Sequence, residues 1–449
     1  MKRYTSLAII LAAVITASFT GCGALGYLSA DETAASGSSE SPISAIFTSA
    51  DVNVSSSSTT SSASAASYTA ASGGVLDGSG MFTSRDLKQS ADLSEATNVK
   101  VSDGETVDIT EEGVYVISGS AKDCTIRVEA PSDAKVQLVL SGLTIENADF
   151  PAIYVVSADK VFITSQGENS LTVTGQFTAD GNTNTDAVIF SRDDITLCGD
   201  GSLEIVSSYG NGISGKDDIK ITGGVYTIRS ALDGIEANDS IRVCGGDISV
   251  TSNKDGFHAE NDEDNSLGYI YIAGGTISVK AADDAIHATT VVQIDGGELD
   301  LTGAEGIEGT YIQINGGVID ITASDDGVNA AYKSKSYTPT FEMNDGELTV
   351  AVGQGDTDAF DSNGDIVVNG GTINITAQMS SFDYDGRATY NGGTIIINGQ
   401  QVDSIPQSMM GGGMGGFGGG GFGGWGGNAG GNNGSWGGGF GGGFGRGRG

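Results

Sequence analysis

The chain has 449 residues, 72 of which are glycine, and it carries a formal net charge of −36 at pH 7. This length exceeds that of most single compact domains, so we expect repeats, tails or several domains. The negative charge argues against nucleic acid as a partner and favours cations, or polyanions held through cations. With two histidines, His258 and His287, the chain is not expected to hold zinc in a site built mainly of histidine.

The first 22 residues have the pattern of an export signal. Two basic residues precede the apolar run LAIILAAVITASF, which is too short to span a bilayer as a mature helix. The run leads into FTGC, which resembles a bacterial lipobox with Cys22 as the lipid acceptor, although Phe19 stands where leucine is usual. We therefore expect residues 1–22 to be a lipoprotein signal peptide that leaves the exported chain anchored on the extracellular face of the cell membrane. The alternative is an ordinary secretory signal with an incidental cysteine.

Two low-complexity segments flank the central part of the chain. Residues 23–84 are rich in serine, alanine and threonine, and such a composition cannot bury a core, so we expect a disordered linker. Residues 406–449 form a glycine-rich tail that is also expected to lack a packed core. The intervening residues 85–405 contain short runs of isoleucine, valine and threonine that alternate with polar residues, which predicts β-strands.

A short sequence unit recurs through residues 85–405. It occurs as DIKITGGVYTIRS, SIRVCGGDISVTS, YIYIAGGTISVKA and VVQIDGGELDLTG, and the units are mostly about 20–25 residues apart. One unit cannot bury its apolar face alone, whereas stacked units bury continuous rows such as Ile219, Ile241, Ile270 and Val292. We therefore predict an all-β fold, a parallel β-helix with three strands in each coil. The spacing of a leucine-rich repeat is missing, and the twofold alternation argues against a helical solenoid.

Equivalent residues of stacked coils should form columns, because neighbouring strands lie about 4.8 Å apart. Cys198 and Cys244 fall in one column two coils apart, about 10 Å, which is too far for a disulfide, so we expect free thiols. The column continues through Asp295 into a series of asparagines that we expect to form a ladder of hydrogen bonds. These asparagines are Asn315, Asn344, Asn369 and Asn391.

Acidic residues form further columns. An Asp-Gly or Glu-Gly pair recurs in successive units, a second polar column lies three residues further on, and paired aspartates occur in SRDD and SGKDD. Singly, each Asp-Gly pair is a turn former, because glycine accepts a positive φ. Carboxylates stacked about 5 Å apart repel, however, and raised pKa values or bound cations would offset the repulsion. Carboxylate oxygens suit Ca²⁺, which is the expected cofactor. The candidate ligands are Asp193, Asp194, Asp217, Asp218, Asp233, Glu236, Asp255, Asp284 and Asp326.

Several segments resemble a known family. EEGVYVISGSAKDCTIRVEAP, VQLVLSGLTIENADFPAIYV and NTDAVIFSRDDITLCGDGSLEI are similar to clostridial-type secreted carbohydrate-binding domain-containing proteins, and the resemblance covers roughly residues 95–400. It implies a right-handed parallel β-helix, similar to family 9 pectate lyases, that binds Ca²⁺ and acidic plant polysaccharide, notably polygalacturonate, with affinity for cellulose. The aspartates that match the family's acidic steps are Asp193, Asp194, Asp217, Asp218, Asp233 and Asp255.

Three functions are compatible with the sequence. The leading hypothesis is a monomeric, non-catalytic, calcium-dependent polysaccharide binder at the cell surface, with Tyr209 and Lys254 as sugar contacts. The first alternative is a polysaccharide lyase with Lys254 as its base, although the adjacent Asp255 favours the charged form of that lysine. The second alternative is a structural adhesin in which the repeats serve as a stalk. His258 and His287 are stacked neighbours in this register and are interpreted as an outward polar ladder, with a role in metal binding as the alternative.

Overall fold

The computed structural model describes residues 68, 73–355 and 357–407. Within this part of the chain the strands pair in parallel, except in the terminal hairpin of β33 (Thr394–Ile397) and β34 (Gln400–Val402). These residues contain no α-helix, and the one short 3₁₀ helix among them is η1 (Gly78–Gly80). The prediction of an all-β chain with parallel sheets is confirmed.

Some of the expectations fall on residues that lie outside this description. They concern the signal peptide at residues 1–22 with its Cys22, the linker up to residue 67, and the tail from residue 408. No helix in the described ranges is long and apolar enough to cross a membrane. Cys198 and Cys244 are free thiols, as expected.

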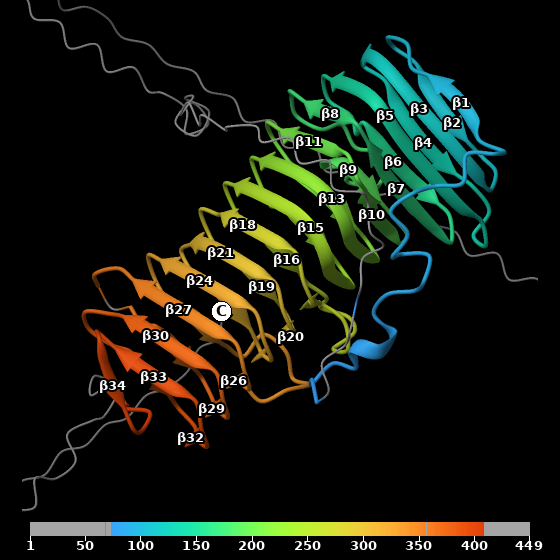
Figure 1. Ribbon diagram of the computed structural model, residues 1–449. Coiled ribbons are helices and arrows are strands. Elements are labelled where there is room, and N and C mark those ends of the chain that lie inside the picture. The colour runs from blue at the N-terminus through green and yellow to red at the C-terminus, as the bar shows by residue number, and fades with distance from the viewer. Residues whose placement is uncertain (1–67, 69–72, 356, 408–449) are drawn as a thin grey trace, which may run out of the picture. The chain divides into compact units, whose positions relative to one another are not determined.

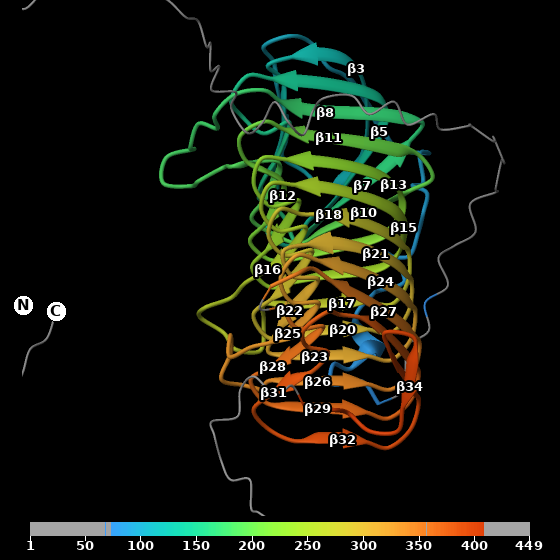
Figure 2. The ribbon, with the colours of Figure 1, turned by 90° about the vertical axis from the view of Figure 1, so that its left-hand side faces the viewer.

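Two parallel sheets run the length of the described chain, as Figures 1 and 2 show. The larger sheet has 22 strands, namely β33, β34, β1 (Thr97–Lys100), β3 (Gly113–Lys122), β5 (Lys135–Asn147), β7 (Lys160–Gln166), β8 (Glu168–Val173), β10 (Ile195–Gly199), β11 (Ser202–Ser207), β13 (Asp218–Ser230), β15 (Ser240–Ser252), β17 (Tyr269–Ile272), β18 (Thr276–Lys280), β20 (Val291–Ile294), β21 (Glu298–Gly303), β23 (Tyr311–Ile314), β24 (Val318–Ala323), β26 (Thr340–Met343), β27 (Glu347–Val352), β29 (Asp365–Val368), β30 (Thr372–Thr376) and β32 (Ala388–Tyr390). The smaller sheet has 12 strands, namely β2 (Thr106–Ile109), β4 (Thr125–Glu129), β6 (Ile153–Ser157), β9 (Ala187–Ser191), β12 (Asn211–Gly215), β14 (Ile235–Ala237), β16 (Phe257–Ala259), β19 (Ile286–Ala288), β22 (Ile307–Gly309), β25 (Val328–Ala330), β28 (Phe360–Ser362) and β31 (Asp383–Tyr384).

Each circuit of the chain adds two strand segments to the larger sheet and one strand to the smaller sheet. Strands β17, β18 and β19 pair with β20, β21 and β22 of the next circuit. The register places Ile219, Ile241, Ile270 and Val292 side by side, and all four are fully buried, so the predicted apolar row is present. Burial of each such side chain contributes about 1.5–3 kcal/mol, which explains why the row recurs in every coil.

Two kinds of glycine shape each circuit. The second glycine of a Gly-Gly pair bends the chain within the larger sheet: Gly246 and Gly275 have φ values of 105° and 108°, which residues with a Cβ rarely adopt. The glycine of the Asp-Gly pair does not have a positive φ, so the turn explanation is wrong for it. There a Cβ has no room: on Gly234 it would lie 2.3 Å from Cγ1 of Val250. Glycine is needed at this position because the coils approach each other closely.

Residues 73–92, which we call the strap, pack along the larger sheet and are drawn in blue in Figures 1 and 2. Met81 and Phe82 of the strap are buried in a cluster with Tyr271, which has no exposed surface. The linker predicted from the sequence includes residues 73–84, which are packed in the structure. They pack because the segment GVLDGSGMF carries apolar side chains that bury aromatic rings of the sheet.

The asparagine ladder is present in the larger sheet. Asn315 donates a hydrogen bond from Nδ2 to Asp295 at 2.7 Å, and Asn344 donates to Asn315 at 2.8 Å. Asn369 donates to Asn344, and Asn391 to Asn369, each at 2.7 Å. Each amide therefore connects two neighbouring coils.

Candidate functional site

The acidic columns lie at the smaller sheet and the turns that lead into it. Three aspartates of the first column, Asp233, Asp255 and Asp326, each accept a hydrogen bond through Oδ1 from a backbone N–H of the next coil. Asp233 Oδ1 accepts from the amide of Asp255 at 3.0 Å, and Asp255 Oδ1 accepts from the amide of Asp284 at 3.1 Å. The second column also has the predicted register across β12, β14, β16, β19, β22, β25 and β28, and it consists of Ser214, Glu236, His258, His287, Glu308, Asn329 and Asp361.

The two histidines lie between carboxylates. Their rings are stacked, with centroids 4.8 Å apart and planes 17° from parallel. Asp255 Oδ2 lies 3.4 Å from Nδ1 of His258 and 3.7 Å from Nδ1 of His287. On the far side of the rings, Nε2 of His258 lies 3.5 Å from Glu260, and Nε2 of His287 lies 3.3 Å from Glu308. Each imidazole therefore has an acidic group at both ring nitrogens.

The histidines line a hollow of about 320 Å³. We call it the acidic hollow and define it by Lys254, Asp255, His258, Asp284, His287, Glu305, Glu308 and Lys333. Two lysines offset part of its negative charge. Lys254 Nζ lies 3.0 Å from Asp233 Oδ2, and Lys333 Nζ lies 2.7 Å from Glu308 Oε1.

Three carboxyl groups on consecutive coils have strongly raised pKa values. Burial, followed by the charge of Glu305, raises the pKa of Asp284 to about 9. Burial and the charge of Glu308 raise the pKa of Glu305 to about 8. Burial, followed by the charge of Asp361, raises the pKa of Asp326 to about 7. Near neutral pH Asp284 and Glu305 keep their protons, and Asp326 titrates, unless a cation compensates the charge.

Lys254, the candidate base, has a raised pKa. Burial lowers the pKa of this lysine, but the hydrogen bond to Asp233 and the charges of Asp233 and Asp255 outweigh burial. A lysine that holds its proton more firmly is a poor general base. Its side chain is 42% exposed, so it remains accessible to a ligand in the acidic hollow.

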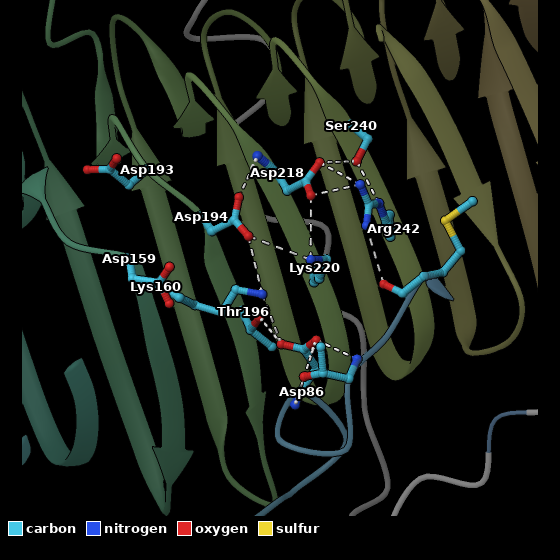
Figure 3. A network of polar contacts seen from close by, with 12 residues as sticks. Asp86, Asp159, Lys160, Asp193, Asp194, Thr196, Asp218, Lys220, Ser240 and Arg242 are labelled. Atoms are coloured by element: carbon cyan, nitrogen blue, oxygen red, sulfur yellow. Dashed lines mark hydrogen bonds and ion pairs between the residues drawn. The ribbon is translucent and has the colours of Figure 1, made fainter. Parts of the chain in front are cut away.

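The aspartates of SRDD and SGKDD lie elsewhere, beside β10 and β13 of the larger sheet. Figure 3 shows Asp194 and Asp218 there in a network with basic side chains. Asp194 lies 3.2 Å from Lys160 Nζ, and Asp218 lies 2.7 Å from Nη2 of Arg242. Asp86 of the strap completes the network at 3.3 Å from Lys160. Protein cations therefore already neutralise these two carboxylates.

The other sequence candidates take separate positions. Asp193 accepts a hydrogen bond from the backbone of Ala158 at 3.1 Å. Burial, with the charge of Asp239, raises the pKa of Asp217 to about 6. Glu236 accepts hydrogen bonds from Asn211 and Ser214 at 2.8 and 2.9 Å. The structure thus places Asp255 and Asp284 in the acidic hollow, with Asp233 next to Asp255 and Lys254. Asp193, Asp194, Asp217 and Asp218 do not line the hollow.

Aromatic side chains that could stack on a sugar are few among the described residues. Tyr209, in the turn between β11 and β12, is 47% exposed. Tyr332, next to Lys333, is 70% exposed. Tyr269 and Tyr271 are buried in the cluster with the strap, so they are not available to a ligand.

Comparison with known proteins assigns the chain to a family. The model of a family described as carbohydrate-binding domain-containing protein matches residues 103–359 and 302–404, which is more than half of the chain. The chain belongs to this family. The resemblance noted in the sequence is thereby confirmed, and the acidic hollow lies within the matched residues.

Two similar proteins show how much of the chain is shared. A carbohydrate-binding domain-containing protein of Acetivibrio thermocellus is 38% identical over 130 residues, which are 28% of this chain and 45% of that protein. The chain therefore spans less than half the length of this curated relative. A polysaccharide lyase-like protein from C. thermocellum, solved as a gadolinium derivative, is 29% identical with a TM-score of 0.44 and covers 56% of this chain and 99% of its own.

Some residues of the hollow were missed by reasoning from the sequence. Lys333 lies in the insertion YKSKSYTPT, which interrupts the repeat and has no counterpart in other coils. Glu305 and Glu308 belong to the acidic columns, so their place in the repeat could have identified them as site residues. Their burial could not be predicted from the sequence. His258 and His287 were placed side by side correctly, yet their contacts with Asp255 depend on side-chain directions that one sequence does not give.

Proposed function

We propose that this protein is a non-catalytic carbohydrate-binding protein that holds acidic polysaccharide, foremost polygalacturonate, through Ca²⁺. Asp284, Glu305 and Asp326 carry the proposal, because their pKa values are raised to about 9, 8 and 7 on three consecutive coils. Burial and the repulsion of neighbouring carboxylates oppose their ionisation at neutral pH, and a bound cation would relieve this. Ca²⁺ accepts about six to eight oxygen ligands, so positions would remain for the carboxylate and hydroxyl groups of a uronic acid.

The scaffold in this proposal is a right-handed parallel β-helix, whose coils repeat the carboxylates at a regular interval. Lys254 and Lys333 line the same hollow and would pair with uronate carboxylates. Tyr209 and Tyr332 are exposed and would stack on sugar rings. Cellulose has no carboxylate to bridge to calcium, so we propose that it binds more weakly than polygalacturonate.

The protonated state of Lys254 favours binding over cleavage. A lyase needs a free base to remove the C5 proton of the sugar, whereas the contacts of Lys254 with Asp233 and Asp255 favour its charged form. We also propose that the protein is exported and acts at the cell surface, with a lipid on Cys22 as its anchor.

The proposal is tested by equilibrium binding of the full chain to polygalacturonate, to its methyl ester and to cellulose, with Ca²⁺ and with a chelator. We expect calcium-dependent binding to polygalacturonate, weaker binding to the other two, and recovery after chelation when Ca²⁺, but not Zn²⁺, is returned. The polysaccharide should be recovered without new reducing ends or unsaturated uronides. Binding that is equal with and without chelator would contradict the role of calcium, and unsaturated products would support the lyase alternative.

A further inference from the structure

We infer that Asp255, His258 and His287 form a binding site for a divalent transition-metal ion of the zinc class, distinct from calcium. The count of histidines argued against a site built mainly of histidine, but the structure brings both of them to one carboxylate. This inference does not depend on polysaccharide binding, because it concerns the protein and the metal ion alone.

The spacing of the donor atoms fits a small ion. Zinc lies about 2.0–2.2 Å from nitrogen and oxygen ligands, and a tetrahedral arrangement then separates the ligand atoms by about 3.3 Å. Asp255 Oδ2 is 3.4 and 3.7 Å from the two Nδ1 atoms, and the three donor atoms all lie within 4.8 Å of one another. Asp284 Oδ2 lies 3.5 Å from Nδ1 of His287 and offers a fourth ligand. The two rings are 17° from parallel, so they must tilt toward each other for both Nδ1 lone pairs to converge on one ion.

The far ring nitrogens supply an independent observation. His258 is 5% exposed, and its Nε2 is buried without a hydrogen-bond partner. A metal ion on Nδ1 fixes the proton on Nε2, and metal-bound histidines usually donate that N–H to a carboxylate. Glu260 lies 3.5 Å from this nitrogen, and its side chain is 56% exposed and can approach. Glu308 stands in the same relation to Nε2 of His287 at 3.3 Å.

The donor set selects the class of metal. Ca²⁺ and Mg²⁺ prefer sites made of oxygen, whereas imidazole nitrogen suits zinc, cobalt, nickel and copper. Two imidazoles with one or two carboxylates therefore discriminate against the calcium proposed for the neighbouring carboxylates. The site opens on the acidic hollow, which gives the ion an entry path.

Lys254 competes with the ion for this position. Its Nζ lies 3.3 Å from Nδ1 of His258 and 3.7 Å from Asp255 Oδ2, so its positive charge is directed at two of the donors. The side chain is partly exposed and can withdraw when a metal ion binds. Removal of this ammonium should therefore strengthen metal binding.

The test is a titration of the metal-free full chain with Co²⁺, followed by its visible spectrum. We expect one equivalent to give the intense absorption of tetrahedral cobalt with nitrogen ligands, displaceable by Zn²⁺ and not by a large excess of Ca²⁺. His287→Asn should lower the affinity at least about tenfold. Lys254→Met should raise it, whereas Lys280→Met, an equal change of charge on exposed β18, should not.

Several results would overturn the inference. They are a spectrum of octahedral hydrated cobalt throughout the titration, displacement by Ca²⁺, and unchanged binding in His287→Asn. An equal effect of Lys254→Met and Lys280→Met would also overturn it, because that outcome would indicate only a general effect of charge. The expected gain of affinity in Lys254→Met cannot arise from unfolding, so the test stays decisive if the histidine variant folds poorly.

Discussion

The carboxylate of Asp86 lies 3.3 Å from the ammonium of Lys160 and accepts a hydrogen bond from the Thr196 hydroxyl at 3.0 Å. Asp86 has no exposed surface, so this contact ties the strap to the larger sheet through a buried charge pair. Loss of one member of such a pair typically costs about 3–5 kcal/mol. Asp194 also contacts Lys160, at 3.2 Å, and would partly compensate.

We therefore predict that Asp86→Ala lowers the free energy of unfolding by about 3 kcal/mol, measured by denaturant titration. Asp92→Ala, which removes an exposed carboxylate two residues from Ser94, serves as the control and should have a small effect. Equal stability of Asp86→Ala and the parent protein would mean that the buried pair of Asp86 and Lys160 does not stabilise the fold.

The raised pKa values predict how stability depends on pH. A carboxyl group whose pKa is higher in the folded than in the unfolded state stabilises the fold below its unfolded pKa, and this contribution is lost as the pH rises through the folded pKa. Asp284 and Glu305 shift from 3.8 and 4.5 to about 9 and 8, so their contribution declines between about pH 4 and pH 9. The thermal midpoint of the calcium-free protein should accordingly fall from pH 6 to pH 9.

Asp284→Asn should reduce this loss of stability with rising pH. At pH 9 we expect the free energy of unfolding to lose less by on the order of 2 kcal/mol than in the parent protein. Asp300→Asn, on β21, is the matched control, because it removes an exposed carboxylate and should leave the profile unchanged. If Asp284→Asn follows the parent profile at every pH, Asp284 is not a cause of the loss of stability at high pH.

The asparagine ladder predicts a local loss of stability on truncation. Asn344→Ala removes one hydrogen bond donated to Asn315 and one accepted from Asn369. Each hydrogen bond contributes about 0.5–1.5 kcal/mol, so we expect a loss of about 1–2 kcal/mol in denaturant unfolding. Asn374→Ala, at an exposed position of β30, should change stability much less. Equal losses in the two variants would show that the ladder is not stabilising.

The regular parts of the molecule could be predicted because they repeat. The row Ile219, Ile241, Ile270 and Val292 and the asparagine column follow from the period alone, since equivalent residues must stack. The strap could not be predicted, because a short irregular segment such as that around Met81 and Phe82 has no period.

The division of the acidic residues was also hidden in the sequence. Asp194 and Asp255 look alike in one dimension, but the first lies against Lys160 and the second against two histidines. Which partner a carboxylate meets depends on the coil and the face on which each side chain lies. One sequence does not show which columns of side chains lie next to each other.

The export signal makes a separate prediction about location. If Cys22 receives a lipid, Cys22→Ser should move the protein from the membrane fraction to the soluble extracellular fraction of the cells. A substitution at another cysteine, Cys124→Ser, controls for effects of thiol loss. Unchanged membrane association of Cys22→Ser would remove the lipid anchor from the account.

The most direct test of the central claim is retention of the full chain on immobilised polygalacturonate as a function of Ca²⁺ concentration, for the parent protein, Glu305→Gln and Asp300→Asn. We predict no retention in chelator, half-maximal retention of the parent at a defined Ca²⁺ concentration, and a requirement about tenfold higher for Glu305→Gln, the equivalent of 1.4 kcal/mol of lost calcium affinity. Asp300→Asn should match the parent. Retention that persists in chelator, or an identical calcium dependence of Glu305→Gln and the parent, would contradict calcium-mediated binding at the acidic hollow.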